Sequence, residues 1–169
     1  MRVQCIYSSY KDVVPPLDPE RYSYISELYL IRAKEYVVYG LSVLKGDGKI
    51  LYYIIDETGR PRSYISDLFD IVDSRFTIAD WHFGLGTEQH TVSFIFGYEE
   101  FVKTRLHFEG VILQETEDLE RFWKWKEIID KQDTHPEEEW EMVKTDIDGV
   151  DITFKRNRRT GEYDDFKFV

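Results

Sequence analysis

Residues 36–73, YVVYGLSVLKGDGKILYYIIDETGRPRSYISDLFDIVD, carry the densest run of strand and turn signals in the chain. Residues 37–43 alternate with the period of two that is typical of a strand with one well-buried face. A second apolar run follows at residues 50–55. Between the two runs, Asp47 and Gly48 offer the two positive-φ positions of a type I′ turn, so this stretch predicts a β-hairpin.

The register of this hairpin can be predicted by counting outward from the turn. A two-residue loop would place Val43 opposite Tyr52 and Leu41 opposite Ile54. We expect this side of the hairpin to face the core. Gly40, which has no side chain in mid-strand, predicts a bulge or a sharp bend.

A second turn at residues 56–61, DETGRP, leads to a third short strand around Tyr64 and Ile65 and to an apolar group at residues 68–72. Short strands joined by tight turns form a bent meander, and such a meander commonly closes into an SH3-like barrel. The predicted fold class is therefore α+β and mainly antiparallel β, with an SH3-like bent meander or small barrel.

Outside this stretch the signals are shorter. Residues 2–7 and 91–96 each predict a strand, and Gly84-Leu85-Gly86 predicts a turn. Apolar residues near helical spacing predict a short helix within residues 98–107. Residues 111–113 are expected to form a brief extended connection.

Residues 116–132 predict a helix. Thr116 suits the N-cap, and Glu117 and Asp118 place negative charge in the first turn, where the helix dipole favours it. The apolar stripe of this helix consists of Leu119, Phe122, Trp123 and Ile129. We expect the stripe to cover the open side of the sheet.

The C-terminal part has a different pattern. Residues 133–139, DTHPEEE, predict an acidic hinge, and residues 140–144, 150–154 and 163–169 predict a small β-meander. The expected organisation is an SH3-like domain at residues 1–132 followed by an extension at residues 133–169. Whether this extension is a separate module or adds strands to the first sheet is left open by the pattern.

Charge indicates the kind of partner. The chain has 33 acidic and 22 basic residues, a formal net charge of −11, which repels nucleic acid over most of the surface and attracts a cationic protein. Solubility alone would also account for this charge. Cys5 is the only cysteine, which excludes an internal disulfide and a cysteine-based zinc site. The lack of a signal peptide and of a long apolar run predicts a cytoplasmic location.

Motifs for catalysis or cofactor binding are missing from the sequence. The four histidines, His82, His90, His107 and His135, show no metal-binding spacing, and the chain has no Walker sequence or dinucleotide-binding loop. We therefore expect no cofactor, no metal and no catalytic residue. The basic run at residues 155–159 could contact phosphates, but acidic residues follow it and a solvated hairpin end explains it as well.

Three segments together resemble a group of known proteins: YVVYG at residues 36–40, DExGxP at residues 56–61 and LFxIVD at residues 68–73. In their pattern of turn and core residues they are similar to small acidic bacterial proteins with SH3-like barrels. Among these are the immunity proteins that accompany secreted or contact-delivered toxins. The resemblance covers roughly residues 30–130. It implies an inhibitor that binds and occludes a cognate toxin domain, often a nuclease with a basic cleft.

The first hypothesis is therefore a non-enzymatic binding protein of the immunity or antitoxin type, in which acidic side chains steer the encounter and aromatic side chains anchor it. The candidate partner-binding residues are Asp56, Glu57, Tyr64, Trp81, Glu137, Glu138, Glu139 and Trp140. One alternative is an enzyme or small-ligand module that uses His82 and His90. Another is an SH3-like nucleic-acid-binding module that uses the basic run at residues 155–159. The oligomeric state is not predicted.

Overall fold

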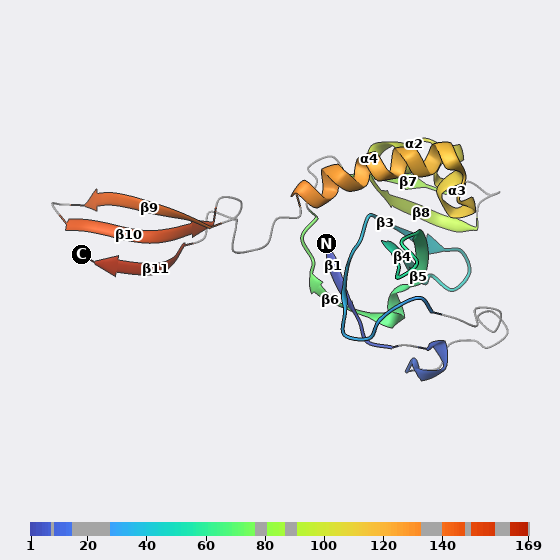
Figure 1. The fold of residues 1–169 in the computed structure, drawn as a ribbon, viewed down its shortest axis with the longest axis horizontal. Coiled ribbons are helices and arrows are strands. Elements are labelled where there is room, and N and C mark those ends of the chain that lie inside the picture. Colours follow the sequence, from blue (N-terminus) through green and yellow to red (C-terminus); the bar gives the residue numbers. More distant parts are fainter. Residues whose placement is uncertain are drawn as a thin grey trace. The chain divides into compact units, whose positions relative to one another are not determined.

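The computed structural model describes residues 1–7, 9–14, 28–76, 81–86, 91–132, 140–147, 150–157 and 163–168 (Figure 1). Its strands are β1 (Arg2–Cys5), β2 (Glu35–Val37), β3 (Gly40–Leu44), β4 (Ile50–Ile55), β5 (Pro61–Ile65), β6 (Phe69–Asp73), β7 (His82–Leu85), β8 (Val92–Gly97), β9 (Trp140–Ile147), β10 (Val150–Asn157) and β11 (Tyr163–Phe168). Its helices are α2 (Glu99–Lys103), α3 (Arg105–Leu113) and α4 (Thr116–Gln132), with short 3-10 turns η1 (Tyr10–Asp12) and η2 (Ser66–Leu68).

The fold is α+β with antiparallel strand pairing, as the sequence predicts. Three sheets are present in the described part of the chain, with strand orders β2-β1-β6, β5-β4-β3-β8-β7 and β11-β10-β9. The predicted meander is confirmed as β3-β4-β5, but it does not close into a barrel. It continues through β8 to β7, so the five-stranded sheet is open, with β5 and β7 at its two edges.

The chain divides into two compact units, Met1–Ile129 and Asp130–Val169. The first unit holds β1 to β8 and most of the helical residues, and the second holds the predicted small meander, β9-β10-β11. In the second unit, β10 pairs with both of its neighbours in antiparallel fashion. The domain boundary at residues 132 and 133 stays a prediction.

The β3-β4 hairpin has a longer loop than the sequence indicates. Leu41 pairs with Tyr52 and Val43 with Ile50, so the predicted register is wrong by two residues. The Leu44 N–H donates to the Lys49 carbonyl and closes a four-residue loop, in which Gly46 and Gly48 both have positive φ. Because the shift is an even number, each side chain still points to the predicted face.

Both faces of this hairpin contribute residues to a buried cluster, although the alternation predicts only one buried face. The strand-side cluster is a core of residues from β1, β2, β4, β5 and β6 and their connections: Met1, Val3, Cys5, Val13, Leu30, Tyr36, Val38, Tyr52, Ile54, Tyr64, Ile65, Leu68 and Phe69. The helix-side cluster joins the sheet to the helices: Tyr39, Tyr53, Val92, Ile95, Tyr98, Phe101, Phe108, Val111, Phe122 and Ile129. The central strands are therefore packed on both sides, with the helices over one face (Figure 1).

Gly40 is the first residue of β3, because the strand predicted at residues 37–43 is divided into β2 and β3 of two different sheets. It pairs directly with Gly97 of β8, and the two glycines leave a hollow in which the Phe101 ring of α2 lies. A Cβ at Gly40 would lie 2.6 Å from Phe101 Cε1, and a Cβ at Gly97 would lie 2.9 Å from Phe101 Cδ1. The glycine at the start of β3 thus allows close approach of an aromatic ring.

Two further segments differ from the sequence expectation. Gly84 and Leu85 belong to strand β7 and do not form a turn, because the segment pairs with β8 along its length. Residues 111–113 are the last turn of α3, not an extended connection. α4 spans the predicted residues 116–132, and its Phe122 ring packs edge-on against Tyr39 of the sheet, so the covering role of this helix is confirmed.

Gly40→Ala should destabilise the first unit by about 1–3 kcal/mol, because the added methyl group overlaps the Phe101 ring. Phe101→Leu removes that ring and should also destabilise the protein. The double variant should lose less than the sum of the two single losses, because the smaller leucine leaves room for the methyl group introduced at position 40. Urea denaturation of the four proteins measures this coupling. If the losses of unfolding free energy in the two single variants add up to the loss in the double variant, the packing of Phe101 against Gly40 does not contribute to stability.

Candidate functional site

The predicted partner-binding residues Asp56 and Tyr64 lie together, inside the fold. The Tyr64 hydroxyl donates to Asp56 Oδ2 at 2.8 Å, and both residues are buried. Asp56 Oδ1 accepts from the Thr58 N–H and from the Thr58 hydroxyl, and Arg62 Nε lies 3.1 Å from Asp56 Oδ2. The carboxylate of Asp56 is therefore saturated with internal donors and holds the turn between β4 and β5 in place.

Glu57 of the same turn remains partly exposed. It accepts from Lys34 Nζ at 2.6 Å and from the Tyr36 hydroxyl at 2.8 Å. The hydrogen bond from Lys34 lowers the pKa of Glu57, and the bond from Tyr36 lowers it further. Arg62 stacks over the Tyr29 ring, 4.8 Å from its centroid. A partner at this turn would therefore meet Glu57, Arg62 and Tyr29 and not the buried Asp56–Tyr64 pair.

Trp81 lies just before β7 in a group of aromatic rings. Its ring centroid is 4.7 Å from that of Phe76 and 4.9 Å from that of Phe96. Its indole Nε1 is buried and has no hydrogen-bond partner in the described part of the chain. Trp81 is thus a half-buried residue that borders the outer part of the sheet.

The remaining predicted residues are less fully described. His82 is half-buried on β7, and His90 lies outside the described residues. A joint role of the two histidines therefore stays a prediction. Glu137, Glu138 and Glu139 also lie outside the described residues, and Trp140 is described only as the first residue of β9. Their partner-binding role stays a prediction.

A buried polar trio, which the sequence patterns do not reveal, connects Tyr98, at the junction of β8 and α2, to α3 and α4. Asp118 Oδ1 lies 2.8 Å from His107 Nδ1, and His107 Nε2 lies 2.8 Å from the Tyr98 hydroxyl. Because a carboxylate only accepts, Nδ1 carries the proton, and Nε2 accepts from Tyr98. Arg121 also approaches Asp118 Oδ1, at 3.4 Å.

The trio has the hydrogen-bond order hydroxyl, imidazole and carboxylate that is found in catalytic relays, but solvent and substrate cannot reach it. Tyr98 and His107 are fully buried, and the Asp118 carboxylate packs so closely on Gly110 that a Cβ there would overlap it. Substrate cannot reach a group with no exposed surface, so the trio has a structural role. In the sequence, Asp118 is explained by its place in the first turn of α4, where the helix dipole favours an acidic residue. This explanation gives no sign of the contact that Asp118 makes with His107 of α3.

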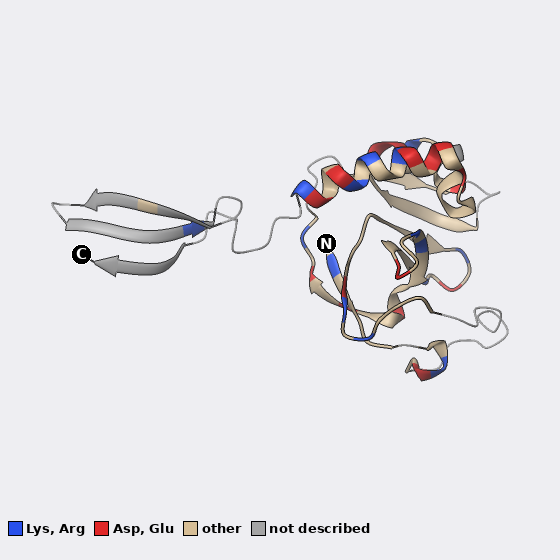
Figure 2. Cartoon of the chain, in the orientation of Figure 1, with Lys and Arg blue, Asp and Glu red and all other residues tan. Residues whose placement is uncertain are grey.

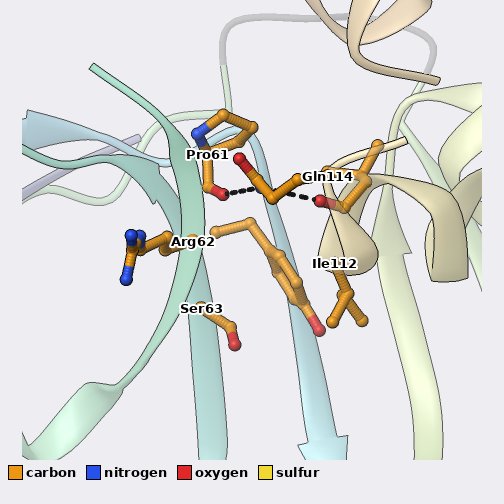
Figure 3. Close-up of a pocket in the computed structure, with 7 residues that line it drawn as sticks. Pro61, Arg62, Ser63, Ile112 and Gln114 are labelled. Carbon is orange, nitrogen blue, oxygen red and sulfur yellow. Dashed lines mark hydrogen bonds between the residues drawn. The ribbon is translucent and has the colours of Figure 1, made fainter. Parts of the chain in front are cut away.

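One pocket of about 350 Å³ lies between strand β5 and the C-terminal end of α3. Gln114, in a left-handed conformation after α3, donates through Nε2 to the Pro61 and Val111 carbonyls at 2.8 and 2.9 Å (Figure 3). Figure 3 also shows that the Arg62 side chain points away from Ile112 and Gln114, and Arg62 is the one charged residue of the pocket lining. Tyr53 and Ser63 supply two further polar side chains of its lining. This pocket has no nucleophile with a base beside it.

The five-stranded sheet leaves part of one face uncovered. A row of apolar residues crosses four paired strands, Leu85 of β7, Phe94 of β8, Val43 of β3 and Ile50 of β4, with Phe83 beside it. We call these five residues the open apolar face. Leu85 is 76% exposed, Phe83 60% and Ile50 37%, whereas Val43 and Phe94 are half-buried.

Charge is absent from this face. Strands β3, β4, β7 and β8 contain no Lys, Arg, Asp or Glu, and β7 and β8 are tan in Figure 2. The face is thus an apolar surface on a protein that otherwise carries many charges. Among the described residues no group of His, Cys, Asp and Glu could hold a metal ion.

The chain matches no protein-family model, no curated protein and no solved structure. Within the described residues, no helix has the length and apolar character needed to cross a membrane.

His107→Ala should cost at least about 2 kcal/mol of unfolding free energy, because it leaves both the Tyr98 hydroxyl and the Asp118 carboxylate buried without their shared partner. Tyr98→Phe removes one bond and should cost about 1 kcal/mol. His82→Ala, at the half-buried histidine of β7, is the control and should stay within about 0.5 kcal/mol of the wild type. Equal losses for His107→Ala and His82→Ala would rule out a stabilising trio.

Stability should fall above about pH 10, the ordinary pKa of tyrosine. Burial raises the pKa of Tyr98, Tyr53 and Tyr64, and the hydrogen bond to Asp56 raises that of Tyr64 further. These phenols ionise in the unfolded chain before they do so in the folded protein, so rising pH favours unfolding. Urea denaturation from about pH 8 to about pH 11 measures the loss. Tyr98→Phe should make the loss less steep, and an unchanged slope would contradict the assignment.

Proposed function

We propose that this protein is a non-enzymatic binding protein whose partner is a cationic protein. The observation that carries the proposal is the open apolar face, because its Phe83 and Leu85 side chains are exposed while the rest of the first unit has two well-formed cores. Apolar and aromatic side chains supply most of the energy at protein interfaces, and charge sets the rate of encounter.

Charge selects the class of partner. A net charge of −11 raises the local concentration of a basic protein and slows the approach of an acidic one. Glu57 and the acidic residues Glu137, Glu138 and Glu139 are the predicted electrostatic contacts, with Trp140 beside them. In this division of roles, acidic side chains steer the partner and Phe83 and Leu85 anchor it.

Polar side chains that could perform chemistry are engaged elsewhere. Asp56 holds a turn, and His107 and Asp118 hold two helices together. These observations support a stoichiometric binder. In the form that the resemblance to immunity proteins favours, the protein occludes a basic toxin domain, such as a nuclease.

The test is binding to the purified products of the genes that flank the gene for this chain. A basic protein among them should bind, and its association rate should fall as salt rises, because charges are screened beyond about 10 Å at 0.1 M salt. Replacing both Phe83 and Leu85 by Ser should weaken binding at least about tenfold, mainly through faster dissociation.

Leu113→Ser is the matched control. Leu113 lies on α3 and is 69% exposed, close to the 76% of Leu85, but it is not part of the open apolar face. It should bind like the wild type. The proposal fails if no basic flanking product binds, or if the Leu113 control loses as much affinity as the Phe83 and Leu85 variant.

A further inference from the structure

The two edges of the five-stranded sheet differ in how they are protected. At β5, Pro61 has no N–H, its carbonyl accepts from Gln114 Nε2, and Arg62 adds a charge. Proline, charge and a covering side chain are devices that prevent another strand from pairing with an edge. At the opposite edge, β7 has the sequence His-Phe-Gly-Leu and none of these devices.

The hydrogen-bond pattern shows which main-chain groups of β7 are free. The Gly86 N–H donates to the Ser93 carbonyl at 2.7 Å, and Gly84 and His82 follow in the same register opposite Ile95 and Gly97. In an antiparallel pair, every second residue exchanges both of its main-chain hydrogen bonds with the partner strand. The main-chain N–H and C=O groups of the residues between them point away from that strand. The N–H and C=O groups of Phe83 and Leu85 therefore point outward from the sheet.

The side chains of the same two residues belong to the open apolar face. Phe83 contacts Phe94, with ring centroids 5.4 Å apart, and Leu85 pairs across the strands with Phe94. Gly84 lies between them and packs against Val102 of α2 on the other face of the sheet. One short strand thus offers free donors, free acceptors and exposed apolar side chains at the same positions.

We propose that the outer edge of β7 binds an extended segment of the cationic partner as a sixth strand of the sheet. This inference rests on the proposed function and adds the mode of binding. The segment hydrogen-bonds to the main chain of Phe83 and Leu85, and its alternate side chains lie on the open apolar face.

A basic segment fits this edge better than a second copy of the chain. Pairing of β7 with β7 of a second copy would bring together two chains that each carry a net charge of −11. A basic partner gains from the same field. Neither β7 nor β8 carries a charge that would repel the incoming strand locally.

The test compares two substitutions at one position. Leu85→Pro removes the outward N–H and breaks no bond to β8, because proline is tolerated where the N–H of an edge strand faces solvent. Leu85→Ala shortens the side chain but keeps the N–H. With a basic flanking-gene product as the partner, Leu85→Pro should weaken binding at least about tenfold more than Leu85→Ala, the equivalent of one or two lost hydrogen bonds.

A synthetic peptide tests the edge independently of that partner and of how well Leu85→Pro folds. The probe is an acetylated peptide of alternating Lys and Val, titrated into the full chain while the amide signals of Phe83 and Leu85 are followed by NMR. Two further peptides have the same sequence, one N-methylated at every Val and the other at every Lys. In an extended strand each set of methyl groups blocks the hydrogen-bond donors along one edge of the peptide. One of them should lose at least about tenfold in affinity, and the other should stay within about threefold of the parent.

Each outcome decides between the proposals. If the basic partner binds but Leu85→Pro and Leu85→Ala lose equally, and both methylated peptides bind alike, strand addition is wrong and the binding function stands. If no basic flanking product binds, the proposed function itself fails, whatever the peptides do. If sedimentation shows a dimer that Leu85→Pro converts to a monomer, the edge pairs with a second copy and the proposal of a basic partner strand is overturned.

Discussion

The structure of the first unit depends on the contact of the Phe101 ring with two paired glycines. Gly40 and Gly97 face each other across β3 and β8, and the ring fills the space that two side chains would otherwise occupy. The same ring contacts Tyr53 of β4 and Phe108 of α3, with centroids 5.0 and 5.2 Å away. One aromatic side chain therefore joins three strands to two helices, which is why the helices can lie so close to the sheet.

Around this contact the sheet is packed on both faces, except along the open apolar face, which runs from β7 to Ile50 of β4. The helix-side cluster covers the face beneath α2, α3 and α4. The trio of Tyr98, His107 and Asp118 connects the junction of β8 and α2 to α3 and α4. The strand-side cluster covers part of the other face, at Tyr52 and Ile54 of β4 and at Leu41 of β3. Beyond it, Trp81 and Phe76 cover Phe96, and the open apolar face begins. The proposed binding surface is thus the part of the sheet that neither core reaches.

Much of the local structure could be predicted from the sequence, because it depends on neighbouring residues. Period-two alternation identified β3, β4 and β8, and the glycines at positions 46, 48 and 59 marked real turns. The helix-start signals at residues 116–118 identified where α4 begins, and its apolar stripe identified its covering role. The errors at Gly84-Leu85-Gly86 and at residues 111–113 have one cause. A glycine-rich segment became a strand because β8 pairs with it, and a short β-branched run became helical because Val111 packs into the helix-side cluster.

The candidate site was less predictable. Asp56 and Tyr64 were identified by residue type as partner contacts, but only the fold brings them together and buries them, because their partners lie on both arms of a turn. The sequence by itself determined the α+β class, the turn positions, the helix at residues 116–132 and the acidic charge, since these depend on local periodicity and composition. Only the tertiary structure decided which sheet edge is guarded, which histidine is buried and which apolar residues are exposed, because these depend on contacts between residues far apart in the chain.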